Sequence, residues 1–222
     1  MDTNNYPRIS FQQRMDAIIE EAEELGKKII EDHRKTIELL SEFDEEKSKT
    51  IKANSIKLDE DSFHLERQCI RFMATEHPFA GDLVFVESLI RVGSHLKRIA
   101  YLLSNIAEIS SNAHSVKIPS HLDEKIQYMG DYVQMMLSKS IYAFLNQNIV
   151  TAKELKDDDD KVDDLFDSIL KEIIDLMSED SENIKAYMDI IFTARFLERI
   201  ADRAVSIGAR TIFILTFKKP RG

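Results

Sequence analysis

Apolar side chains recur every three to four positions along almost the whole chain, which is the spacing of one face of an α-helix. The pattern predicts six long helices, over residues 11–43, 45–75, 79–111, 122–148, 150–178 and 183–217. The stripe of the first helix consists of Met15, Ile18, Ala22, Leu25, Ile29, His33 and Ile37. Pro78 ends the second helix, since proline interrupts helical hydrogen bonding. We therefore expect an all-α fold.

The same pattern of three helices occurs twice along the chain. Sliding the chain by 104 residues superposes Gly26 on Gly130 and Met73 on Met177. Sliding it by 101 residues superposes the segment LKRIA, which begins at Leu96, on LERIA, which begins at Leu197. Chance matches between helix-rich sequences are the alternative, but they would not keep nearly one offset across three helices. The repeat predicts two tandem three-helix bundles.

The segment 110–121 loses the helical periodicity and contains Pro119, so it is the candidate boundary between the bundles. We expect a first bundle over residues 1–112 and a second over residues 113–222. Helices of this length extend roughly 45 Å, so each bundle should be elongated.

Net charge and cysteine content limit the partners and the cellular compartment that are expected for this protein. The 222 residues carry a net charge of −10, so a nucleic-acid partner is not expected. The single cysteine, Cys69, excludes an intramolecular disulfide and fits a reducing compartment. We find no signal peptide and no apolar run of about 18 residues, which predicts a cytoplasmic protein.

Two pairs of acidic residues occupy partly apolar helix faces in the second half. Glu198 and Asp202 are four residues apart, and so are Asp159 and Asp163 in the preceding helix. Residues at that spacing lie one turn apart on the same side of a helix. If the last two helices are antiparallel neighbours, the four carboxylates meet and repel one another unless a cation lies between them. The spacing therefore predicts a metal site at Asp159, Asp163, Glu198 and Asp202.

The ligands of this predicted site would all be oxygens. Four of the six histidines and the cysteine lie in the first half of the chain, and His114 and His121 both precede the two helices that carry the acids, which argues against structural zinc. Iron, manganese, magnesium or calcium, as a single divalent ion or a multinuclear cluster, fits the oxygen set better. The alternative is that the acidic run is a solvated helix start and that Glu198 and Asp202 pair with nearby arginines.

The first half differs at the equivalent positions. The offsets of 104 and 101 residues place Ser55 and Asp59 where the second half has its aspartates, and Lys97 and Tyr101 where it has Glu198 and Asp202. A lysine ammonium repels a divalent cation and could itself neutralise Asp59. No metal is expected in the first bundle.

Other residues suggest structural roles. We expect Cys69 to be a small core side chain, and His64 and His95 to form hydrogen bonds between helices. The chain has no glycine-rich phosphate loop, no Ser/His/Asp set and no nucleophile beside a base, so we do not expect an enzyme.

The segments DDKVDDLF (159–166), RFLERIADRAVSIGARTIF (195–213) and LKRIAYLLSNIAE (96–108) resemble the PhoU family of phosphate-uptake regulators. The resemblance covers essentially the whole chain. It implies a carboxylate-x-x-x-Asp motif that binds multinuclear metal clusters, which the four second-half acids match and Ser55, Lys97 and Tyr101 do not.

The resemblance also implies a function. A PhoU-like protein would be a cytoplasmic, non-enzymatic homodimer that reaches the membrane only through its partners. Those partners would be a phosphate ABC transporter and a sensor histidine kinase, and the protein would restrain phosphate uptake and phosphate-starvation signalling.

Three other functions compete with this one. The chain could serve a different phosphate transporter, coupled to sodium or protons, or act as a metal-free helical adaptor. A di-iron enzyme is the third, but such enzymes use two Glu-x-x-His motifs, and the chain has no histidine after His121.

Overall fold

The computed structural model describes residues 6–217, with side chains from Ser10 onward. This part contains six α-helices and no strand, which confirms the all-α prediction. The helices are α1 (Tyr6–Ser41), α2 (Glu45–Glu76), α3 (Gly81–Ala113), α4 (Ser120–Leu145), α5 (Ile149–Glu179) and α6 (Ile184–Thr216), with a 3₁₀ turn at Ser181–Asn183. The predicted ends lie within a few residues of these, and α1 begins at Tyr6 rather than at residue 11.

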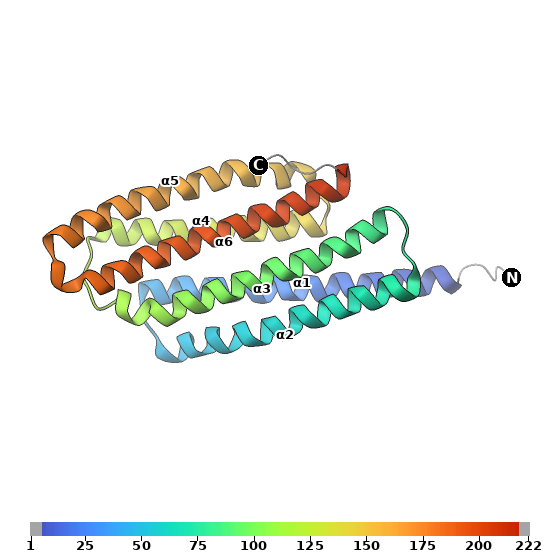
Figure 1. Cartoon of the computed structure of the whole chain (residues 1–222), viewed down its shortest axis with the longest axis horizontal. Helices are drawn as coiled ribbons and strands as arrows, with labels where there is room; N and C mark the ends of the chain where they lie inside the picture. Colours follow the sequence, from blue (N-terminus) through green and yellow to red (C-terminus); the bar gives the residue numbers. More distant parts are fainter. Residues whose placement is uncertain (1–5, 218–222) are drawn as a thin grey trace.

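The helices form two elongated three-helix bundles that lie side by side along their length, α1–α3 in one and α4–α6 in the other (Figure 1). Helix α3 packs against α6 and α1 packs against α4, so the bundles share a long interface. The whole predicted stripe of α1 is buried in this core. The prediction of two three-helix bundles is confirmed, whereas the division of the chain after residue 112 stays a prediction.

Polar caps and backbone breaks set the helix ends. The Asp44 side chain accepts a hydrogen bond from the Lys47 amide at 2.9 Å and so caps the start of α2. The Asn148 side chain caps α5 in the same way, by accepting from two amides of its first turn. Helix α2 ends at Glu76, and the next residue, His77, adopts a left-handed conformation with φ 48° before Pro78.

One glycine lets α5 and α6 approach closely. A Cβ atom added at Gly208 would lie 2.5 Å from Cδ1 of Leu155 and 3.1 Å from the carbonyl oxygen of Ala152. Both contacts are on α5, so the absence of a side chain at Gly208 sets the distance between the two helices that carry the acidic residues.

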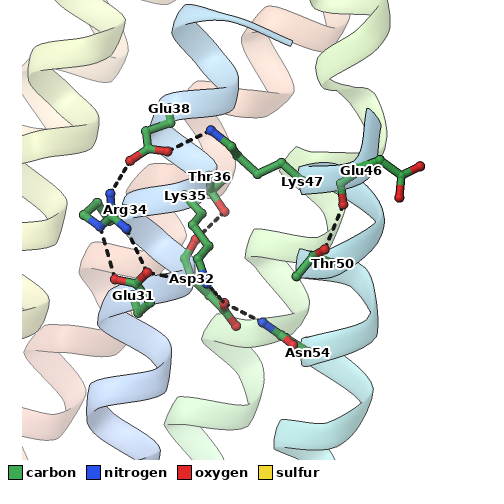
Figure 2. A network of polar contacts seen from close by, with 10 residues as sticks. All are labelled: Glu31, Asp32, Arg34, Lys35, Thr36, Glu38, Glu46, Lys47, Thr50 and Asn54. Atoms are coloured by element: carbon green, nitrogen blue, oxygen red, sulfur yellow. Dashed lines mark hydrogen bonds and ion pairs between the residues drawn. The ribbon is translucent and has the colours of Figure 1, made fainter. Parts of the chain in front are cut away.

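Figure 2 shows a polar network that ties α1 to α2. Asn54 of α2 donates to Asp32 of α1 at 2.7 Å, and Lys35 lies 3.9 Å from the same carboxylate. Burial is the main cause that raises the pKa of Asp32.

The second bundle contains the same arrangement with the acid moved to the other helix. At the positions equivalent to Lys35 and Asn54, Lys139 of α4 lies 2.8 Å from Asp158 of α5. The Tyr132 hydroxyl donates to the other oxygen of this buried carboxylate at 2.8 Å. In each bundle one buried acid thus links the first two helices, with Asn54 as its partner on the other helix in the first bundle and Lys139 in the second, and the acid is on the first helix in one bundle and on the second helix in the other.

Candidate functional site

The four predicted ligands lie on neighbouring helices of the second bundle. Asp159 and Asp163 are on α5, and Glu198 and Asp202 are on α6, which returns alongside α5 after the turn at Ser181–Asn183 (Figure 1). Asp159 and Glu198 are partly buried, while Asp163 and Asp202 are exposed. The acids therefore line the outer edge of the α5–α6 seam, next to the bundle core.

The four carboxylates repel one another electrostatically. Burial and then the negative charges of Asp202, Asp163 and Glu198 raise the pKa of Asp159 to about 6. Burial and the charge of Asp202 also raise the pKa of Asp163. Mutual repulsion of this kind requires the four groups to lie near one another, as the sequence predicted.

The side chains are nevertheless not gathered into a coordination shell. Among the described residues, no group of three or more His, Cys, Asp or Glu side chains is arranged to hold a metal ion. Arg195 donates to Oε1 of Glu198 at 2.6 Å. This oxygen therefore takes part in an ion pair with a nearby arginine, which was the alternative to a metal site. Oε2 of Glu198 is buried and has no hydrogen-bond partner. The donor set and its uncompensated charge fit a hard cation, and the present side-chain positions supply only part of a site.

The first bundle neutralises the equivalent position from within the chain. Lys97 of α3 forms an ion pair with Asp59 of α2, as expected, and Tyr101 one turn further along α3 is exposed. Both partners of this pair are half exposed, so its contribution to stability is small. Its effect is to place a positive charge where the second bundle has only acids.

The other predicted side-chain roles have mixed outcomes. Cys69 is buried, and burial raises the pKa of its thiol to about 12, which confirms a core residue. His64 of α2 lies 2.5 Å from a carboxylate oxygen of Glu21 on α1, as an interhelical contact. The prediction that His95 forms a hydrogen bond between helices is wrong, because its Nδ1 atom is buried without a partner. The arginines around His95 were not predicted from the sequence, although Arg91, His95 and Arg98 are spaced to lie on one face of a helix.

Within residues 6–217, none of the helices is both long enough and apolar enough to cross a membrane.

Comparison with known proteins gives a consistent picture. The PhoU domain family matches residues 22–110 and again residues 126–211. A phosphate-specific transport system accessory protein, PhoU homolog 1 of Methanothermobacter thermautotrophicus, is 50% identical over 215 residues, which span 97% of this chain and 98% of that protein. The PhoU homolog of Clostridium acetobutylicum is 28% identical over 186 residues, 82% of this chain and 84% of that protein.

Solved structures agree on the fold. The crystal structure of PhoU from Pseudomonas aeruginosa superposes with a TM-score of 0.88 at 21% identity, covering 94% of this chain and all of that one. The phosphate transport system regulatory protein PhoU from Streptococcus pneumoniae gives a TM-score of 0.88 at 23% identity, with 96% of this chain and all of that one covered. With its duplicated three-helix bundle, a double match to the domain and a relative of half-identical sequence over nearly the full length, the chain belongs to the PhoU family.

Proposed function

We propose that this protein is a cytoplasmic, non-catalytic regulator that restrains phosphate uptake and phosphate-starvation signalling. In this role it contacts a phosphate ABC transporter and a sensor histidine kinase. The observation that carries the proposal is the 50% identity, over 97% of the chain, to an accessory protein of a phosphate-specific transport system. The long exposed helices of the two bundles offer the extended surface that an adaptor needs.

The proposal includes a hard cation at Asp159, Asp163, Glu198 and Asp202. A bound cation would neutralise their charge and join α5 to α6. The raised pKa of Asp159 and the unpartnered Oε2 of Glu198 support this assignment, because both leave negative charge uncompensated. The Arg195 guanidinium competes for Glu198, so cation binding has to displace that ion pair.

Metal titration of the purified protein tests the cation site. Asp202→Asn removes one anionic ligand and is expected to weaken binding of manganese or magnesium about tenfold or more. Tyr101→Phe, at the equivalent position of the first bundle, is expected to leave the affinity unchanged. Isothermal titration calorimetry of wild type and both variants measures this.

Two results would contradict the cation proposal. An equal loss of affinity in both variants would mean that the metal lies elsewhere, and a wild type that binds no metal would make the four acids ordinary surface charges. Either result leaves the regulatory role to be tested by pull-down of membrane partners.

We also propose that the protein is a homodimer that associates through α2. Its outer face carries three exposed apolar side chains at intervals of seven residues, with exposed fractions of 69% for Ile56, 60% for Phe63 and 50% for Ile70. That spacing is typical of helices that pair with another helix. Glu60 and Arg67 flank Phe63 and form no ion pair with any described residue. Antiparallel pairing of two copies near Phe63 brings Glu60 of one copy close to Arg67 of the other.

Phe63→Glu is expected to convert the dimer into a monomer, because it places two carboxylates in the middle of the apolar stripe. Size-exclusion chromatography with light scattering at micromolar concentration measures the change. Tyr128→Glu, at an equally exposed position of α4, is the matched control and should leave the dimer intact. A wild type that is already monomeric, or a dimer lost only with Tyr128→Glu, would exclude the α2 interface.

A further inference from the structure

A row of basic side chains follows the contact between α3 and α6, and its register is set at one end by Arg210. The Nη2 atom of Arg210 on α6 donates to Ser88 Oγ on α3 at 2.8 Å and to Oε2 of Glu87. The Phe213 ring lies 4.7 Å from the Arg210 guanidinium and holds it in place. Helices α3 and α6 run antiparallel side by side (Figure 1), and these contacts place residues 87–88 opposite residue 210.

His95 lies two turns after Ser88 on α3, and Arg203 lies two turns before Arg210 on α6, so the antiparallel register brings His95 beside Arg203. The charges on His95 agree with that register: burial is the main cause that lowers its pKa to about 4, followed by the positive charge of Arg203 and then those of Arg98, Arg210 and Arg91. One further turn places Arg98 of α3 opposite Arg199 of α6. The imidazole is therefore neutral at neutral pH and has guanidinium groups from both helices around it.

Most of these arginines have no acidic partner. Arg98, Arg199 and Arg203 form no ion pair with any described residue, although the chain has 40 acidic and only 30 basic residues. Glu87 contacts both Arg91 and Arg210 and is the carboxylate that the row does use. Two buried nitrogens in the row, Nδ1 of His95 and Nε of Arg210, lack a hydrogen-bond partner. A buried donor left without a partner costs free energy, so a ligand that satisfies it is favoured.

The internal repeat places two like charges at the centre of the row. Arg98 and Arg199 occupy the same position of the repeated segments LKRIA and LERIA, and the register places them opposite each other. Both side chains are exposed, so solvent screens part of their repulsion, and an anion between them removes more of it.

We propose that the α3–α6 arginine row binds a phosphoryl oxyanion at its centre, between Arg98, Arg199 and Arg203 and beside His95, while Arg210 sets the register of the row. Guanidinium groups donate paired hydrogen bonds that match a tetrahedral dianion, and neutral His95 adds one N–H donor. The anion is either inorganic phosphate or the phosphoryl group of a small phosphomonoester. This site does not depend on the proposed cation cluster, whose acids are on the flank of α6 that faces α5.

His95 reports on this site directly. A dianion bound beside the imidazole favours its protonated form, so the pKa of His95 is expected to rise from about 4 by about one unit or more. NMR titration of the His95 ring, identified with His95→Gln, measures this with phosphate, with a phosphomonoester and with chloride at the same ionic strength. The phosphate compound that binds more tightly identifies the physiological source. A shift that chloride reproduces in full, or no shift with either phosphate compound, would overturn the proposal.

Three variants complete the test. Arg98→Gln and Arg203→Gln are each expected to weaken phosphate binding about tenfold, since each removes a charged donor. Arg71→Gln is the matched control, because Arg71 is exposed on α2 and also forms no ion pair with a described residue. Asp159→Asn should keep phosphate binding even where it abolishes cation binding, which separates this proposal from the cation site. Equal weakening by Arg71→Gln would show unspecific attraction and contradict an assigned site.

Discussion

Replacing Gly208 by valine is expected to lower the free energy of unfolding by about 3 kcal/mol, because the new side chain has no space between α5 and α6. Its Cβ alone would lie 2.5 Å from Leu155 Cδ1 and 3.1 Å from the Ala152 carbonyl oxygen. The leucine can rotate away, but the carbonyl belongs to the α5 backbone and moves only if the two helices separate. Urea unfolding followed by circular dichroism measures the loss.

Gly81→Val is the matched control for this substitution. Gly81 lies at the start of α3, and an added Cβ there has no atom within 4 Å. We expect a change in stability much smaller than that at Gly208. If both variants unfold at the same urea concentration as wild type, the close approach of α5 and α6 is not required for stability.

Asp159→Asn is expected to make the metal-free protein more stable at pH 7 by about 1 to 2 kcal/mol, after a reduction for solvent screening at this half-buried site. The pKa of Asp159 is about 6 in the folded chain, against 3.8 for an unperturbed aspartate. Between these two values the folded state binds more protons than the unfolded state. Stability contributed by Asp159 is therefore full below about pH 4 and is lost as the pH rises through 6.

The comparison of wild type with Asp159→Asn at pH 4 and at pH 7 measures Asp159 together with its coupling to the three neighbouring carboxylates, because titrating groups elsewhere cancel. Saturating manganese at pH 7 should then raise the thermal midpoint of wild type and leave that of Asp159→Asn nearly unchanged. Identical pH profiles for the two proteins would show that Asp159 does not carry uncompensated charge in the folded state.

The helices and their duplication were predictable from sequence because the signals are local. A stripe such as the one on α1 repeats within a single helix, and Pro78 acts on its own neighbours, so neither requires knowledge of the partner helix. The pairing of Lys97 with Asp59 was also predictable, because the repeat carried the position of the second-half acids onto the first half. The approach of Asp159 to Glu198 and Asp202 followed from the same reasoning.

The remainder of the candidate site depends on contacts that no single helix specifies. Whether Arg195 or a cation takes Oε1 of Glu198 is decided by side-chain rotamers, which periodicity does not describe. The surroundings of His95 depend on the register between α3 and α6, and that register is set by Arg210, more than a hundred residues further along the chain. The arginines are evident in the sequence, but their approach to one another across α3 and α6 is not.

The two buried acids lie on non-equivalent helices, Asp32 on α1 and Asp158 on α5, and this difference helps a duplicated chain to avoid pairing helices from the wrong halves. Because the bundles are repeats, α1 could in principle assemble with α5, and α4 with α2. The first wrong pair would bury Asp32 and Asp158 together, while the second would leave Lys139 facing Asn54, with Met136 at the position equivalent to Asp32. Only the native pairs give each buried acid a polar partner on the other helix, Asn54 for Asp32 and Lys139 for Asp158. The exchange of a single acid between helices thus lets two halves with one architecture distinguish their own helices during folding, and it disfavours helix exchange between neighbouring molecules for the same reason.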